Sequence, residues 1–154
     1  MQQTVWRPDP STNRSLTLFG GVLAATGGFQ DYPLSVYTGG YLRGPFATRP
    51  NDALGFEATY VTINNKAQGQ VIDTFNSLGL TAPNHANEWV FEANYKIAMA
   101  LGFDLVPVAQ YVIHPDAIGF HSPRPGVGHA FVVGAQVVVN LGEALGLPHW
   151  IRLN

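Results

Sequence analysis

Residues 88–99 alternate between apolar and polar side chains over twelve consecutive positions. Trp89, Phe91 and Ala93 belong to one series, whereas Glu92 and Asn94 belong to the other. Successive side chains of a β-strand point to opposite faces, so this period of two predicts a long strand with one apolar and one polar face. The chain is therefore expected to be built from extended, two-faced strands.

Other segments repeat this period with varying clarity. It is strong in residues 103–114 and 130–141 and blurs beyond Val61 in a third segment, while two glycine-rich segments show it weakly. The strong runs span about ten to twelve residues, which is longer than the ~5–6 residues typical of globular strands. The predicted strands are residues 16–25, 34–43, 53–64, 88–99, 103–114 and 130–141, with residues 2–7 considered as a seventh.

The second face of these strands carries few charges. Charged residues make up 12% of the chain and hydrophobic residues 46%, whereas a soluble protein carries about 25% charged residues. A sheet with one face in water would turn many Lys and Glu outward, but here that face mixes Gly, Val, Asn, Gln and Thr. Strands of ~9–11 residues with an unbroken apolar face are typical of transmembrane β-barrels. We expect an all-β, antiparallel transmembrane β-barrel segment.

Aromatic side chains near the strand ends fit the girdles of such a barrel. The residues assigned to the girdles are Trp89, Phe91, Phe103, Tyr111, Phe131, Tyr60 and Tyr41. One alternative is a soluble all-β binding protein, a sandwich or lipocalin-like barrel, in which the same aromatics would fill the core. A second alternative is an inactive truncated fragment.

Connection lengths support the barrel interpretation. Between the predicted strands, residues 115–129 and 65–87 are long connections, 100–102 is short, and 44–52 and 26–33 are moderate. Outer-membrane barrels alternate long external loops with short periplasmic turns. If the last strand ends in the periplasm, residues 44–52 form a periplasmic turn. Within the longest loop, helical spacing predicts a short amphipathic helix that packs on the loop and contains Val71, Ile72, Phe75 and Leu78.

Charge and cysteine content exclude several classes of function. The net charge of −2 lacks the basic footprint that nucleic-acid binding requires. The absence of cysteine excludes disulfides, cysteine zinc sites and a thiol nucleophile. The first residues lack the basic and apolar regions of a signal peptide, so we expect that the chain as written does not direct its own export.

Three motifs in order resemble the C-terminal part of the carbohydrate-selective porins of the OprB family. They lie at residues 49–55, 91–96 and 107–115, and the similarity extends from about residue 16 to 141. The motif residues singled out, which we interpret as structural, are Arg49, Pro50, Asp52, Tyr95, Pro107, Tyr111, His114 and Pro115.

The resemblance implies a roughly sixteen-stranded barrel around an aqueous channel. It places the chain in the outer membrane of a Gram-negative bacterium, where sugars such as glucose would diffuse into the periplasm. The implied partners are small neutral sugars, outer-membrane lipid and a missing N-terminal half of the barrel, with a homo-oligomer left open. No cofactor is implied.

Polar residues of the strands are the candidate lining of the sugar path. They are Glu57, Glu92, Asn94, Lys96, Asp104 and Gln110. A sugar channel must replace the hydrogen bonds of water without binding tightly, and carboxylate, amide and ammonium groups suit hydroxyl-rich solutes. The alternative is that these groups only satisfy one another on a wet barrel wall.

Two motif positions have a structural and a functional interpretation. Arg49 and Asp52 are either solute contacts or turn residues, and the turn interpretation is favoured because Pro50 sets φ and Asp52 accepts backbone hydrogen bonds. Pro107 lies inside a strand, where proline is confined to edges or bulges, so a structural bulge is expected there.

Enzymatic and metal sites are not expected. Glu88 and Glu92 lie four strand residues apart, about 13 Å, which exceeds the ~5–9.5 Å separation of a glycosidase pair. His114, His121 and His129 surround a proline-rich loop without a carboxylate placed to complete a metal site. The chain is therefore interpreted as a channel segment without catalytic residues or a metal.

Overall fold

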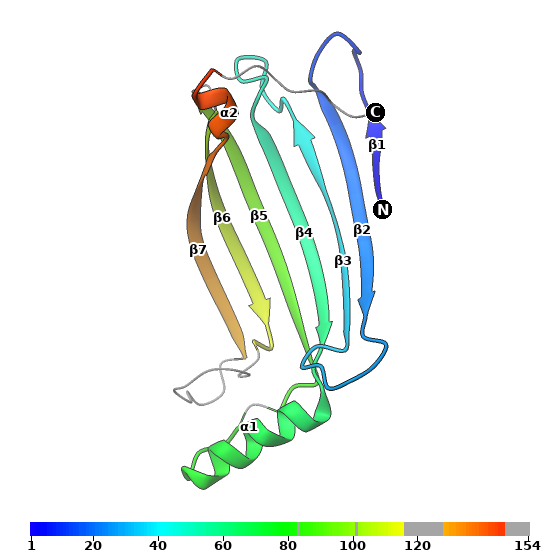
Figure 1. Cartoon of the computed structure of the whole chain (residues 1–154), viewed down its shortest axis with the longest axis vertical. Helices are drawn as coiled ribbons and strands as arrows, with labels where there is room; N and C mark the ends of the chain where they lie inside the picture. The colour runs from blue at the N-terminus through cyan, green and yellow to red at the C-terminus, as the bar shows by residue number, and fades with distance from the viewer. Residues whose placement is uncertain (83, 101, 116–127, 147–154) are drawn as a thin grey trace.

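The computed structural model describes residues 1–82, 84–100, 102–115 and 128–146. In this part of the chain, seven antiparallel strands form one sheet in which each strand lies beside its neighbours in sequence (Figure 1). Each strand boundary lies within two residues of its expected position, and the all-β antiparallel expectation is confirmed. The strands are β1 (Gln2–Trp6), β2 (Ser15–Ala24), β3 (Leu34–Arg43), β4 (Ala53–Thr62), β5 (Asn87–Ala100), β6 (Phe103–Ile113) and β7 (His129–Val139).

The pairing register assigns every strand residue to one of two faces. Glu57 pairs with Glu92, which in turn pairs with Gln110. Residues directly opposite one another share a face, so these three side chains form one row. Phe56 pairs with Ala93 on the reverse side. We call the side that carries Glu92 the polar face and the side that carries Ala93 the apolar face.

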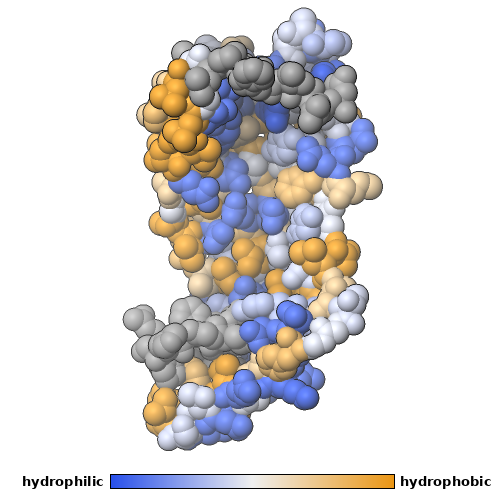
Figure 2. Space-filling view, viewed as in Figure 1, coloured by the Kyte–Doolittle hydropathy of each residue, from blue (hydrophilic) through white to orange (hydrophobic). Residues whose placement is uncertain are grey.

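The apolar face is not covered by a second layer in the described part of the chain. Phe131 is 70% exposed and Phe56 54% exposed, although both lie within strands. A soluble sandwich would bury such residues against a second sheet. The hydrophobic side chains that are buried among the described residues are only Ile63, Ala67, Phe75 and Val112. Figure 2 shows a hollowed side of the sheet with hydrophilic side chains gathered near its centre.

The aromatic residues divide between the two faces, and one assignment was wrong. Tyr41 pairs with Gly55, which pairs with Asn94, so Tyr41 belongs to the polar face. Its strand contains the adjacent glycines 39 and 40, which leave no apolar–polar alternation from which the face could be deduced. The expected girdle residues that the register places on the apolar face are Trp89, Phe91, Phe103, Tyr111, Phe131 and Tyr60.

Pro107 does not form the expected bulge. Its strand keeps an unbroken register with β7, and the irregularity between β5 and β6 lies at Ala98/Ala100 instead. On the β5 side, the pairing runs to Asn94↔Val108 and resumes at Ile97↔Leu105 within the described residues. Proline has no backbone N–H to donate, so it costs local hydrogen bonding without inserting a residue.

Successive connections lie alternately at the two ends of the sheet (Figure 1). One end carries α1 (Asn65–Ser77), which lies between β4 and β5 and confirms the helix expected there. The side-chain Nε2 of Gln68 donates to Asn84 Oδ1 and to the His85 carbonyl, so hydrogen bonds tie the helix to the segment that follows it. The other end carries residues 44–52, Gly102 and the short helix α2 (Leu141–Ala144). Neither helix within the described ranges is long and apolar enough to cross a membrane.

Candidate functional site

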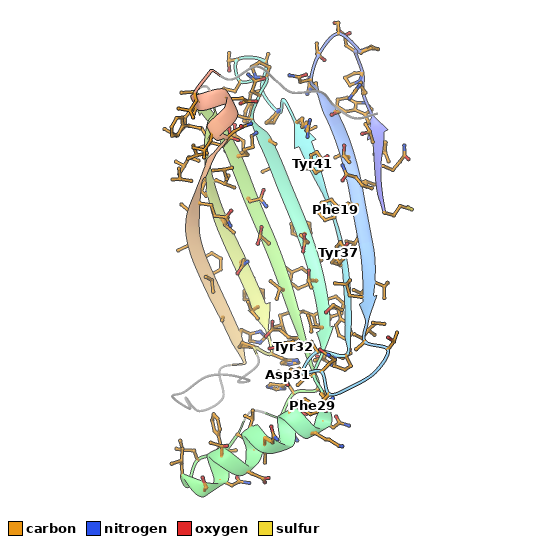
Figure 3. All side chains as sticks on the ribbon, viewed as in Figure 1. Phe19, Phe29, Asp31, Tyr32, Tyr37 and Tyr41 are labelled. Carbon is orange, nitrogen blue, oxygen red and sulfur yellow. The ribbon has the colours of Figure 1, made fainter. Side chains whose placement is uncertain are left out.

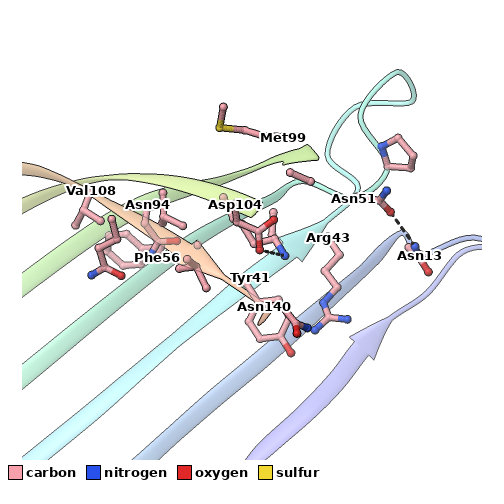
Figure 4. A pocket seen from close by; sticks show the side chains of 18 of the residues that line it. Asn13, Tyr41, Arg43, Asn51, Phe56, Asn94, Met99, Asp104, Val108 and Asn140 are labelled. Atoms are coloured by element: carbon pink, nitrogen blue, oxygen red, sulfur yellow. Dashed lines mark hydrogen bonds and ion pairs between the residues drawn. The ribbon is translucent and has the colours of Figure 1, made fainter. Parts of the chain in front are cut away.

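The polar face lines a hollow of about 930 Å³. The hollow spans β2 to β7 and reaches the turn residues at the α2 end, as the close view shows (Figure 4). Charged and amide side chains that line it include Arg43, Glu57, Glu92, Asn94, Lys96 and Asp104. Five of the six residues predicted to line the path therefore surround one space.

Glu92 is the centre of a hydrogen-bonded group on this wall. Gln110 Nε2 donates to Glu92 Oε2 at 2.7 Å, and Asn94 Nδ2 donates to Glu92 Oε1 at 2.9 Å. The sixth predicted residue, Gln110, is thereby joined to the lining group. Glu57 lies directly opposite Glu92 and accepts from the Thr59 hydroxyl at 2.8 Å. Two carboxylates side by side repel each other, so the wall here favours groups that donate hydrogen bonds.

Lys96 and Asp104 add a balanced pair of charges nearer the α2 end. The Lys96 ammonium lies 3.0 Å from Asp104 Oδ2, and both side chains are partly exposed. An exposed pair of this kind contributes little to stability, about 0–1 kcal/mol. Because the two charges are opposite and adjacent, the pair adds no net charge to the lining of the hollow.

Aromatic rings on β2 and β3 also belong to the polar face, on the side of the hollow away from β6 and β7. Phe19 and Tyr41 both line the hollow, and Tyr41 accepts a hydrogen bond from Gln2 Nε2 at 2.7 Å. The Arg43 guanidinium lies 5.4 Å from the centre of the Tyr41 ring, a cation–π distance. Sequence reasoning did not single out Phe19 and wrongly assigned Tyr41 to a girdle, because their strands lack clear alternation. The sequence signal that could have revealed them is an aromatic residue in one predicted strand and a glycine in the strand that follows it, because the two residues pair across the sheet.

The turn motif at residues 49–52 is a structural anchor. Asp52 is 1% exposed, and its carboxylate accepts from Arg49, from the Tyr95 hydroxyl at 2.6 Å and from the Ala98 backbone N–H at 3.0 Å. The hydrogen bonds from Arg49 lower the pKa of Asp52 to about 2, with Tyr95 and Ala98 acting in the same direction against burial. A carboxylate enclosed in this way ties the turn to β5 and is inaccessible to a solute. Pro50 lies in the same turn and lines the hollow.

The histidines gather at the α1 end. His114, which precedes Pro115, stacks on His85 with ring centres 4.1 Å apart, and the His129 ring stacks on Tyr111 at 5.7 Å. Burial, and secondarily the charge of His114, lower the pKa of His85. Among the described residues, no group of three His, Cys, Asp or Glu side chains is placed to hold a metal ion. His121 lies outside the described residues.

Comparisons with known proteins agree with this geometry. The family model described as carbohydrate-selective porin, OprB family, matches residues 1–141. No curated protein sequence matches the chain. Among solved structures, a high-pH structure of Pseudomonas putida OprB superposes with a TM-score of 0.72 at 21% identity, covering 90% of this chain and 33% of that chain. The chain thus spans about a third of the length of that protein, and the likeness shows a shared fold.

Proposed function

Because the chain belongs to the OprB family of carbohydrate-selective porins, we propose that it forms part of an outer-membrane barrel through which small neutral sugars diffuse. The family indicates a channel protein rather than an enzyme, in the outer membrane of a Gram-negative bacterium. In this proposal the apolar face contacts lipid and the polar face borders water.

The observation that carries the proposal is the difference between the two faces of one sheet. One side presents Ala93 and Phe131 without a covering layer, and the other presents the group around Glu92 in a hollow. Lipid-facing and lumen-facing residues alternate in this way along the strands of membrane barrels. A soluble binding protein would have to cover the apolar side.

The wall chemistry favours neutral, hydroxyl-rich solutes. Glu57 and Glu92 offer acceptors, Asn94 and Gln110 offer both donors and acceptors, and these groups replace the hydrogen bonds that a sugar makes with water. Conduction requires several weak sites rather than one tight site. The paired charges of Lys96 and Asp104 work against a strong preference for either sign of ion.

The remainder of the barrel is the necessary partner. In the described part of the chain, β1 and β7 each pair along one side only. Seven strands fall short of the eight that the smallest bacterial barrels contain. We propose that further strands, supplied by the rest of a longer polypeptide or by a separate chain, pair with these edges. Open edges of this length would otherwise recruit other chains.

The test is sugar flux through the complete barrel after Glu92→Gln and Asp104→Asn are combined. Liposome swelling would compare a monosaccharide, a disaccharide and an amino acid in the double variant and the parent. We expect altered relative sugar rates with near-normal barrel assembly, because lumen substitutions tune permeation. Ala109→Val on the apolar face is the control and should leave all rates unchanged. If the double variant and the parent show the same rate for every solute, these side chains have only a structural role.

A further inference from the structure

Three aromatic rings follow one another along the polar face of β2 and β3. The ring of Phe19 lies between those of Tyr41 and Tyr37, with centre-to-centre distances of 6.5 Å to each. The register places all three on the polar face, and each is half-buried. Figure 3 shows them in a column that Tyr32 and Phe29 extend toward the α1 end. The spacing between rings is comparable to the length of one six-membered sugar ring.

Glycines leave room for two of these rings on the neighbouring strand. Phe19 pairs with Gly39, and a Cβ at Gly39 would stand 2.6 Å from Phe19 Cζ. Tyr37 pairs with Gly21, where a Cβ would stand 2.5–2.9 Å from three atoms of the tyrosine side chain. Each ring therefore occupies the place of a missing side chain on the next strand, and Phe19 also lines the hollow.

Hydrogen-bonding groups border the rings on the β4 side. Beyond Gly39, the row that contains Phe19 continues to Glu57 and Glu92. The row that contains Tyr41 continues through Gly55 to Asn94, whose Oδ1 takes up the space above Gly55 at 2.5 Å from the missing Cβ. A flat apolar surface with acceptors and amides along its edge matches the two sides of a pyranose, which has apolar C–H faces and hydroxyls around its rim.

We propose that Tyr41, Phe19 and Tyr37 form an aromatic track that binds the C–H faces of cyclic sugars and selects them over open-chain polyols. The proposal rests on the proposed function, since it names the solute feature that the channel recognises. Glu57 and Asn94 hold the ring hydroxyls while the sugar moves from one aromatic ring to the next. The Arg43 guanidinium lies over the Tyr41 ring, 5.4 Å from its centre, at the end of the track.

The test measures the half-saturating concentration for glucose flux through the complete reconstituted barrel, with the acyclic hexitol sorbitol as a matched solute. Phe19→Leu and Tyr37→Leu, made separately, should each raise the glucose value about two- to tenfold, the range for loss of one aromatic contact. Sorbitol flux should not change. Phe19→Tyr retains a ring and should restore the parent value. Phe91→Leu, on the apolar face, is the control and should leave both solutes unaffected.

The outcomes separate the track from the channel function. A parent barrel that passes neither glucose nor sorbitol would refute the proposed function and the track with it. If the parent passes glucose but the leucine variants change glucose and sorbitol flux equally, or change neither, the aromatic track is refuted and the channel function is not. Equal amounts of assembled barrel are compared throughout, and because the two leucine variants are independent, failure of one to assemble leaves the other to decide.

Discussion

Asp52 is the residue whose replacement should weaken the sheet most clearly, because every group around its carboxylate is a donor. Asp52→Asn keeps the shape but removes the charge and turns an amide N–H₂ toward Arg49, the Tyr95 hydroxyl or the Ala98 N–H. The pKa of Asp52 is held at about 2, below its ordinary value of 3.8, and the stabilisation of the ionised form that this represents is about 2 kcal/mol. The partner Arg49 is 45% exposed, so screening reduces this to about 1–2 kcal/mol.

The donor left without an acceptor adds to this loss. An unmatched buried donor costs about 1–3 kcal/mol, and together the two effects predict a loss of about 2–5 kcal/mol in the free energy of unfolding. The assay is urea unfolding of the complete barrel in lipid vesicles, followed by tryptophan fluorescence. Glu143→Gln on α2 is exposed and should change stability by less than about 0.5 kcal/mol. A loss of that small size for Asp52→Asn would refute the anchor.

The pH dependence provides a second, independent check on the same residue. The pKa of Asp52 is lower in the folded than in the unfolded chain, so its ionised form stabilises the fold. The contribution is complete above the ordinary value of 3.8 and is lost as the pH falls toward about 2. The stability difference between parent and Asp52→Asn should therefore narrow across that interval. A difference that stays constant would show that charge plays no part.

Two further substitutions test the faces and the packing of the wall. Ala93→Arg on the apolar face should cost about 2–4 kcal/mol if it lies near the bilayer midplane, whereas Asn94→Arg should be tolerated and change only transport; folding into vesicles measures both, and equal tolerance would contradict the face assignment. Gly39→Ala would bring a Cβ within 2.4 Å of the Phe56 carbonyl oxygen, so the free energy of unfolding should fall by about 1–3 kcal/mol, while Gly27→Ala, with open space around it, should leave it unchanged.

The strands with clear alternation were the easiest part of the fold to predict. In β5, Glu92 and Asn94 contrast with Phe91 and Ala93, so both the strand and its faces follow from the period of two. Tyr41 was misplaced because the glycines beside it carry no polarity with which to judge the face. Apolar–polar patterning assigns faces only where both sides of a strand bear informative side chains.

The anchor and the aromatic track depend on contacts that local patterns do not encode. Asp52 was correctly suspected of a turn role, but its bonds to Tyr95 and Ala98 join residues 43 and 46 positions apart. The pairing of Phe19 with Gly39 depends on the register between β2 and β3, and a shift of one residue would reverse every face. Pro107 was expected to form a bulge, but the strand keeps its register with β7. The strand accommodates the proline by giving up one backbone N–H donor.

The connection that contains α1 leaves and rejoins the sheet at neighbouring points. The Ile63 N–H donates to the Ala86 carbonyl at 2.9 Å, directly beyond the Thr62↔Asn87 pair. The two ends are thus fastened independently of what lies between them, and doubling the length of a flexible loop costs only about 0.6 kcal/mol. This connection is accordingly the place where a foreign epitope or affinity tag can be spliced in for purification or imaging, with the register of β4 and β5 preserved.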